Sequence, residues 1–171
     1  IAVVGAGLMG CGIAQVFLAA GHSVSLYDPY PEALAKAAPN MRANLQSIGG
    51  SQACLARLTL CEHVGDAVGQ AAFVFEAGPE KLELKQRIFA QLDAAAPAAA
   101  VLASNTSVIP ITDIASKLPP GRQAHVVGTH WWNPPYLIPL VEVVRTVQLS
   151  DTAFDRTMAL HPSAAEELVT M

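Results

Sequence analysis

Continuous apolar runs alternate with more polar, helix-forming stretches along the 171-residue chain. Because apolar and polar residues do not alternate within the runs, they favour strands buried on both faces, and we expect strands at 1–7, 22–28, 57–64, 71–78, 99–105, 125–131 and 140–146. The intervening stretches predict helices at 8–21, 31–49, 80–96, 110–118 and 151–161. Pro39 is expected to break or kink the second helix.

The order of these elements indicates a parallel sheet that is covered by helices on both faces. The sequence therefore predicts the α/β class, with a doubly wound and mostly parallel sheet. Residues 1–150 hold all the expected strands. Residues 151–171 hold a C-terminal helix and a tail for which we predict no element. Because a strand already begins at Ile1, we expect the chain to be a fragment or to lack its first residues.

The composition narrows the possible partners. The chain is 52% hydrophobic and only 14% charged, which excludes intrinsic disorder. Its apolar runs are interrupted well before the roughly 18 residues of a membrane span, and no basic segment precedes the first of them, so we expect neither a membrane helix nor a signal peptide. A net charge of −4 without a basic cluster argues against a nucleic-acid partner.

The cysteines and most histidines suggest no metal chemistry. Cys11, Cys54 and Cys61 are odd in number and no pair has CxxC spacing, which favours free thiols in a reducing compartment and hence a cytoplasmic protein. The remaining histidines lie near the ends of expected elements without a ligand pattern, so we expect no metal site; they are His22, His63, His125 and His161.

The segment GAGLMG at residues 5–10 follows a strand and opens a helix, the context in which G-x-G-x-x-G binds a dinucleotide. Gly5 permits a tight turn, Gly7 lets the backbone approach a pyrophosphate, and Gly10 allows the helix to pack closely on the strand. Leu8 and Met9 complete the expected cofactor-binding loop. The alternative interpretation is a glycine turn without a ligand.

Asp28 ends the second expected strand, eighteen residues after Gly10. A carboxylate at this point can accept hydrogen bonds from a ribose diol, and it would repel a 2′-phosphate. No Arg or Lys lies close to it in sequence. We therefore expect a Rossmann-type domain that binds NAD in preference to NADP, while the plainer interpretation is a surface aspartate.

Five segments carry a resemblance to a known family: GAGLMG, EKLELKQRIF, ASNTS at 103–107, HWWNPP and LVEVV. In this order and spacing, the last two are specific. From Ile1 to about residue 160, the chain resembles the NAD-binding domain of L-3-hydroxyacyl-CoA dehydrogenases. The resemblance implies NAD-dependent oxidation of a substrate hydroxyl, by residues 1–150 acting as the NAD-binding Rossmann domain.

The resemblance also implies roles for individual residues. His130 matches the catalytic base, and Glu142 matches the acid that orients it and stabilises the imidazolium. Ser107 and Asn133 match polar groups suited to bind the reacting oxygen or the cofactor carboxamide. Glu80 and Lys85 match the acid and lysine on the nicotinamide side.

Plainer interpretations remain open for these residues. His130 and Glu142 could be a core histidine and an edge-strand acid. Ser107 and Asn133 could cap loops at strand ends. Glu80 and Lys85 could lie on a solvated helix face.

The chain departs from the family pattern in three ways. Trp131 and Trp132 stand where the family has two phenylalanines, so the shape of the site is expected to differ. Asn44 and Ser51 stand where the family contacts the CoA nucleotide with Ser and Lys, which removes a cation. Nothing matches the helical C-terminal substrate domain, which in the family also makes most of a homodimer interface.

These observations support three functions. The leading hypothesis is the cofactor domain of an NAD-dependent L-3-hydroxyacyl-CoA dehydrogenase that forms a homodimer at full length. The first alternative keeps the chemistry but changes the substrate to a small free hydroxy acid or hydroxy amine, such as a sugar acid or carnitine. The second is a nucleotide-binding module that is inactive without its substrate domain.

Overall fold

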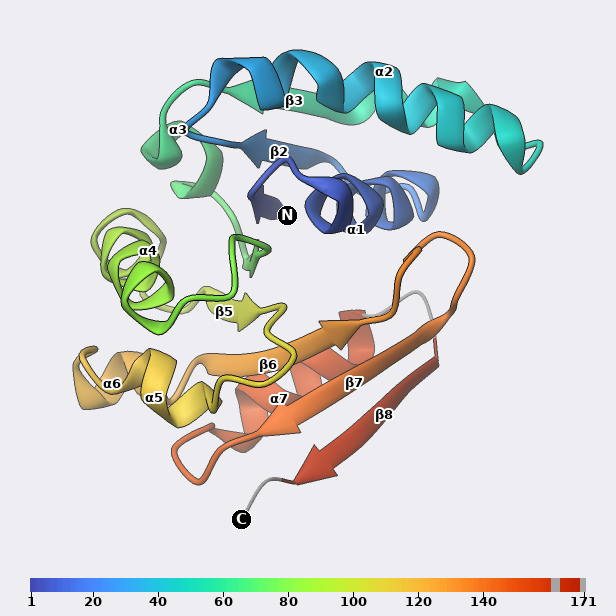
Figure 1. Cartoon of the computed structure of the whole chain (residues 1–171). Coiled ribbons are helices and arrows are strands. Elements are labelled where there is room, and N and C mark those ends of the chain that lie inside the picture. The colour runs from blue at the N-terminus through green and yellow to red at the C-terminus, as the bar shows by residue number, and fades with distance from the viewer. Residues whose placement is uncertain (161–163, 170–171) are drawn as a thin grey trace.

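The computed structural model describes residues 1–160 and 164–169, and it shows one eight-stranded sheet in the order β3-β2-β1-β4-β5-β6-β7-β8 (Figure 1). The strands are β1 (Ala2–Val4), β2 (Val24–Tyr27), β3 (Leu58–Cys61), β4 (Phe73–Glu76), β5 (Val101–Ser104), β6 (Val126–Trp131), β7 (Leu140–Arg145) and β8 (Ala164–Val169). The helices are α1 (Leu8–Ala19), α2 (Pro31–Ser47), the 3₁₀ helix η1 (Gln52–Arg57), α3 (Val64–Val68), α4 (Leu82–Ala95), α5 (Ile111–Ala115), α6 (Pro120–Gln123) and α7 (Asp151–Leu160).

Strand pairing confirms the doubly wound, mostly parallel class. The strands from β3 to β6 pair in parallel, β7 runs antiparallel to β6, and β8 runs parallel to β7. Each expected helix and strand is present with shifted ends, and the structure adds η1, α3, α6 and β8. The expected last helix ends at Leu160, and His161 lies outside the described residues.

Two apolar clusters fill the two faces of the sheet, which explains why the strands are apolar throughout. One cluster joins residues of α1, α2 and α7 to one face, with Phe17, Met41 and Trp131 among its buried members. The other joins α3, α4 and α5 to the opposite face, with Phe89 and Leu92 fully buried.

Of the break or kink expected at Pro39, the break is wrong, because α2 continues from Pro31 to Ser47 with Pro39 inside it. Proline removes one donor of the helical ladder and leaves the carbonyl of Ala35 without its usual partner. Both residues are exposed, so water can satisfy that carbonyl. The cost is therefore smaller than it would be on the buried face.

The sheet reverses its winding between β1 and β4, which lie side by side. The chain leaves β1 towards β2 on one side and leaves β4 towards β5 on the other. A crevice at the carboxyl ends of the strands is the usual result of such a switch point, and ligands of doubly wound proteins bind there. The glycine loop follows β1 directly, so it lies at this position (Figure 1).

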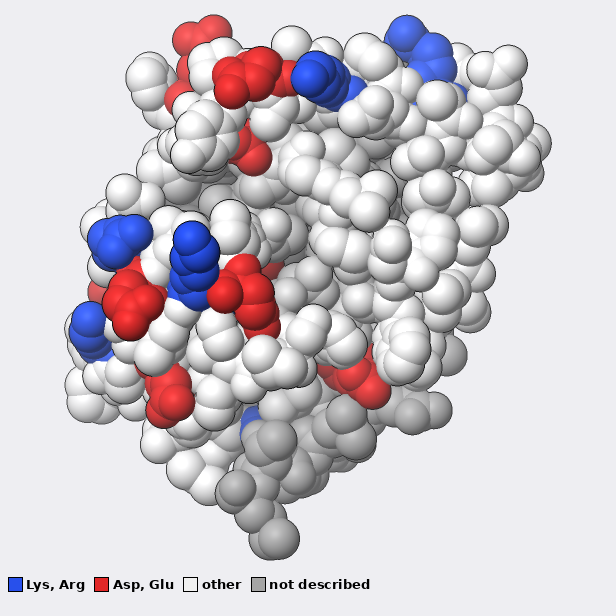
Figure 2. Space-filling model, viewed as in Figure 1, with Lys and Arg blue, Asp and Glu red and all other residues white. Residues whose placement is uncertain are grey.

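The face of the molecule seen in Figure 2 carries charges of both signs. Figure 2 shows acidic and basic side chains interspersed over the upper and left parts of this face, with a largely uncharged region to the right. None of the helices in the described part of the chain has the length and apolar character that a membrane crossing requires.

Candidate active site

The three glycines of the loop differ in what surrounds them. Gly5 has a φ of +109°, in the left-handed region, and a Cβ there would lie 2.8 Å from the Ala77 carbonyl oxygen. A Cβ on Gly10 would lie 1.8 Å from the Gly5 carbonyl oxygen. A Cβ on Gly7 would meet nothing within 4 Å. Gly5 and Gly10 are therefore required by the fold, whereas Gly7 borders open space.

That open space suits an anion such as the pyrophosphate of NAD. Gly7 is the N-cap of α1 and no side chain caps the helix, so the first backbone N–H groups and the positive end of the helix dipole face outward. A groove of about 410 Å³ adjoins it, lined by Ala6, Gly7, Leu8, Tyr30, Glu32, Ala33, Lys36 and Asn40. Leu8 is exposed and Met9 is half-buried, so both border the loop surface.

Asp28 supports the glycine loop directly. Its Oδ2 accepts from the Ala6 N–H at 2.7 Å, and its Oδ1 accepts from the Tyr30 N–H at 2.9 Å. Each carboxylate oxygen can accept a further hydrogen bond, so the residue can still receive a ribose hydroxyl. Lys36 lines the groove beside Gly7, although no Lys or Arg lies close to Asp28 in the sequence.

Cys11 lies behind this loop and takes part in its packing. Its thiol donates to the Ala6 carbonyl at 3.2 Å, and burial together with the Asp28 carboxylate raises its pKa to about 11. The thiol is therefore protonated at neutral pH and is no nucleophile.

His130 and Glu142 are brought together by the antiparallel pairing of β6 and β7. They are direct partners in the register, which places both side chains on the same face of the sheet. His130 Nδ1 lies 2.5 Å from Glu142 Oε2, and each side chain is 26% exposed. Because a carboxylate only accepts hydrogen bonds, Nδ1 is the ring nitrogen that donates to it, and in the neutral imidazole Nε2 is then the nitrogen with the lone pair.

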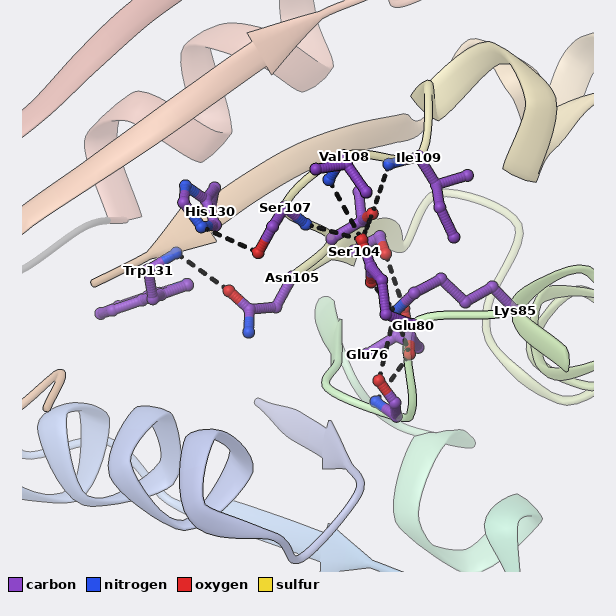
Figure 3. A network of polar contacts seen from close by, with 12 residues as sticks. Glu76, Glu80, Lys85, Ser104, Asn105, Ser107, Val108, Ile109, His130 and Trp131 are labelled. Carbon is purple, nitrogen blue, oxygen red and sulfur yellow. Dashed lines mark hydrogen bonds and ion pairs between the residues drawn. The ribbon is translucent and has the colours of Figure 1, made fainter. Parts of the chain in front are cut away.

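Ser107 reaches the other side of the same imidazole, as Figure 3 shows. Its Oγ lies 3.1 Å from His130 Nε2. The residue sits in the exposed loop after β5, whose last residue pairs with β6. The parallel pairing of β5 and β6 therefore places this loop beside the end of the strand that carries His130.

Glu80 fixes the Ser107 loop from the opposite side (Figure 3). Its Oε1 accepts from the Thr106 hydroxyl at 2.5 Å and from the backbone N–H groups of Ser107 and Val108 at 2.9 and 3.1 Å. Burial acts to raise the pKa of Glu80, but these hydrogen bonds and the Lys85 ammonium outweigh it and hold the pKa below its ordinary value. Glu80 is therefore ionised at neutral pH.

Lys85 is fully buried, which differs from the exposed helix face that its sequence position also allowed. Its Nζ lies 2.9 Å from both carboxylate oxygens of Glu76 and 3.6 Å from Glu80 Oε2. The side chain has no exposed surface. Lys85 therefore contacts the site only through its neighbours.

Sequence reasoning missed Glu76 and Asn105. Glu76 is the last residue of β4, and the only signal for it was an acid at the end of an otherwise apolar run. Asn105 Oδ1 accepts from the backbone N–H of Trp131 at 2.9 Å and so connects the loop after β5 to the end of β6. Asn105 could have been predicted from its place in the ASNTS segment.

The structure does not bring Asn133 into this network. The residue is exposed and follows β6, and its side chain has no hydrogen-bond partner among the described residues. A cis peptide bond joins it to Pro134. Trp132 is 45% exposed, and its ring centroid lies 6.1 Å from that of His130.

Comparison with known proteins places this geometry in context. The family profile described as "3-hydroxyacyl-CoA dehydrogenase, NAD binding domain" matches residues 1–171. An L-carnitine dehydrogenase of Streptomyces griseus is 43% identical over 179 aligned positions, covering 100% of this chain and 52% of the relative. The mitochondrial hydroxyacyl-coenzyme A dehydrogenase of Rattus norvegicus is 32% identical over 186 aligned positions, covering 98% of this chain and 59% of the relative.

A solved structure of 3-hydroxybutyryl-CoA dehydrogenase from Escherichia coli K12 superposes with a TM-score of 0.91 at 33% identity, covering 99% of this chain and 38% of that chain. The chain spans about half the length of the curated relatives it matches. NAD is the cofactor that the matched domain binds, in agreement with the open space at Gly7 and the position of Asp28. The chain therefore belongs to the 3-hydroxyacyl-CoA dehydrogenase family and represents its NAD-binding domain.

Proposed function

We propose that this domain, together with a substrate domain, oxidises the hydroxyl on the third carbon of an acyl compound with NAD, and reduces the ketone in the reverse direction. The observation that carries the proposal is the line of contacts from Ser107 through His130 to Glu142, at 3.1 and 2.5 Å. These contacts lie near the carboxyl ends of β5 and β6, and the glycine loop follows the carboxyl end of β1 in the same sheet. The domain itself corresponds to residues 1–150, with 151–171 as its C-terminal extension.

The nicotinamide ring of bound NAD would supply the hydride acceptor. The chain's part is to hold and move the proton: His130 accepts it at Nε2 from the substrate hydroxyl, and Nδ1 continues to donate to Glu142. The carboxylate fixes the tautomer and stabilises the imidazolium that forms. This role would explain why a partly buried acid, Glu142, stands in the apolar strand β7.

Ser107 and Asn133 would orient the reacting groups. The Ser107 hydroxyl lies at His130 Nε2 and can donate to the substrate oxygen once the proton has moved. Asn133 is exposed beyond β6 and would contact the substrate or the cofactor carboxamide. Gly5, Gly7, Leu8, Met9, Gly10 and Asp28 would hold the adenosine and pyrophosphate half of NAD, and Glu80 would face the nicotinamide half.

Two substrates fit this chemistry, because L-3-hydroxyacyl-CoA and carnitine both carry the hydroxyl on the third carbon. The acyl-CoA is supported by the family profile and by the solved 3-hydroxybutyryl-CoA dehydrogenase. Carnitine is supported by relatives named L-carnitine dehydrogenase at 43% and 40% identity. The absence of the family's CoA-binding lysine at Ser51 also favours a substrate without a nucleotide.

The substrate test is an assay of NADH formation by a protein that joins this chain to its substrate domain. L-carnitine and L-3-hydroxybutyryl-CoA would be compared by kcat/KM. A preference for the CoA thioester supports the leading proposal, and a preference for carnitine supports the second. No turnover of either compound, or of a sugar acid, would contradict the shared proposal. Such a protein is also expected to be a cytoplasmic homodimer.

Cofactor choice provides a separate prediction. The wild-type chain should bind NAD more tightly than NADP, because Asp28 attracts the 2′-hydroxyl and repels a 2′-phosphate. Asp28→Ala should narrow the ratio of the two dissociation constants. It should also weaken both, since the Ala6 N–H loses its acceptor.

Titration calorimetry with both cofactors would measure this ratio. Asp28→Asn is the matched variant, because it removes the charge and keeps one oxygen acceptor. Equal affinities in the wild-type chain, or an unchanged ratio in both variants, would exclude Asp28 as the selecting residue.

A further inference from the structure

Gly12 lies inside α1, two residues after the last glycine of the G-x-G-x-x-G loop. Glycine weakens a helix interior, because it has the most conformational freedom to lose on folding. Here the missing side chain leaves room for a neighbour. A Cβ on Gly12 would lie 2.7 Å from Cδ and 2.9 Å from Cγ of Pro135, well inside the usual contact distance between carbon atoms. The ring of Pro135 therefore occupies the space that a side chain at position 12 would fill.

Pro135 belongs to the loop between β6 and β7, residues 132–139, and it packs where this loop meets α1 (Figure 1). Among these loop residues, all of which the structure describes, Pro135 alone is buried, and the others are exposed or half-buried. Next to Pro135, the loop and the helix line a pocket of about 400 Å³, so they are not closely packed there. The contact between Pro135 and Gly12 is therefore the anchor of this loop on α1.

This anchor joins two parts of the site. Trp132 and Asn133 lie in the same loop, and the Trp132 ring centroid is 6.1 Å from that of His130. On the other side of the contact, α1 has Gly7 as its N-cap, where the pyrophosphate would bind. One close approach of helix and loop therefore connects the segment that would hold the cofactor to the segment that would contact the substrate.

We infer that Gly12 is a positioning residue for the reaction: by accommodating Pro135, it sets the distance between α1 and the loop and so places Trp132 and Asn133 at the substrate. The inference rests on the proposed function for the role of this loop. A methyl group at position 12 would move Pro135 outward by about 1 Å, if ordinary carbon–carbon contact is restored. A misplacement of this size can lower the rate of a reaction by about 10²-fold.

The first test is kinetic and uses the protein that joins this chain to its substrate domain. Gly12→Ala should lower kcat/KM for NADH formation by about tenfold to 10²-fold, with the NAD dissociation constant unchanged, because Gly7 and Asp28 stay in place. Gly65→Ala is the matched control, since this exposed helical glycine of α3 has no atom within 4 Å of its Cβ position. The control should alter neither quantity.

A second substitution separates the contact with Pro135 from damage to the helix. Pro135→Ala removes Cγ and Cδ, the two atoms nearest to the added methyl group. Gly12→Ala should therefore lower kcat/KM much less in the Pro135→Ala protein than in the wild-type protein, which a double-mutant cycle measures. If Gly12→Ala fails to fold, Pro135→Gly removes the anchor from the loop side and should lower kcat/KM with NAD affinity intact.

Fluorescence of the 171-residue chain reports the loop without any substrate. The chain has two tryptophans, of which Trp131 is 2% exposed and Trp132 is 45% exposed. Gly12→Ala should increase the quenching of Trp132 by acrylamide, because the loop moves away from α1. The same substitution in a Trp132→Phe chain should leave the quenching of the remaining Trp131 unchanged.

Three results would overturn the inference: wild-type kcat/KM in folded Gly12→Ala, an equal loss of activity and NAD affinity, or the same loss in the Pro135→Ala protein as in the wild-type protein. Unchanged quenching in Gly12→Ala would also contradict it, because the loop would not have moved. In each case a wild-type protein that turns over its substrate leaves the proposed function standing. Increased quenching in Gly12→Ala, together with a wild-type protein that oxidises no 3-hydroxy compound, would instead contradict the proposed function and confirm the anchor.

Discussion

His130→Gln is expected to lower kcat by about 10²–10⁴-fold, the usual contribution of a positioned general base, in a protein that joins this chain to its substrate domain. Glutamine can occupy the space of the imidazole but cannot take up the hydroxyl proton. NAD affinity should change little, because the glycine loop and Asp28 do not contact His130. Steady-state kinetics of NADH formation and NAD titration would measure the two quantities.

His125→Gln is the matched control for this variant. His125 directly precedes β6, the strand that carries His130, and its Nδ1 lies 3.1 Å from the Gly121 carbonyl oxygen. The control should therefore keep wild-type kcat. Similar losses in both variants would attribute the effect to the stability of β6, and full activity of His130→Gln would exclude His130 as the base.

Gly7→Val should abolish NAD binding while the chain stays folded. Its Cβ would meet no atom within 4 Å, and Gly7 already has an ordinary φ of −72°, so the valine itself is accommodated. Valine is a poorer N-cap than glycine, which costs about 1 kcal/mol or less of stability. The side chain would, however, fill the space in which the backbone approaches the pyrophosphate.

Thermal unfolding and NAD titration on the same sample would separate these effects. Gly121→Val is the control, because a Cβ there also meets nothing and the residue is exposed far along the chain in α6. Gly10→Ala should behave in the opposite way and destabilise the fold, since its Cβ would collide with the Gly5 carbonyl. If the folded Gly7→Val variant binds NAD normally, the glycine loop is only a backbone turn and does not bind the cofactor.

The sequence was sufficient to predict the fold because strands buried on both faces are apolar without alternation. Elements that depend on tertiary contacts were harder. β8 has the sequence AAEELV, which has weak strand propensity, and it is a strand through its pairing with β7. Pro39 reads as a helix breaker, yet α2 tolerates it because its exposed position lets water satisfy the freed carbonyl.

The site was predicted mainly from segments rather than from single side chains. The HWWNPP and LVEVV segments pointed to His130 and Glu142, and the antiparallel register gives the physical reason for their contact. Glu76 could not be found in this way, because an acid at a strand end looks the same whether solvent or a lysine satisfies it. Its partner Lys85 lies nine residues further on, in a different element.

The central claim is that His130 and Glu142 act as one proton-accepting unit, and a double-mutant cycle tests it most directly. The kcat of the wild-type protein would be compared with that of His130→Gln, Glu142→Gln and the double variant. Glu142→Gln should lower kcat, because an amide cannot stabilise the imidazolium, and the combined loss should be far smaller than the product of the single losses. Full activity of Glu142→Gln, or losses that multiply independently, would contradict the account.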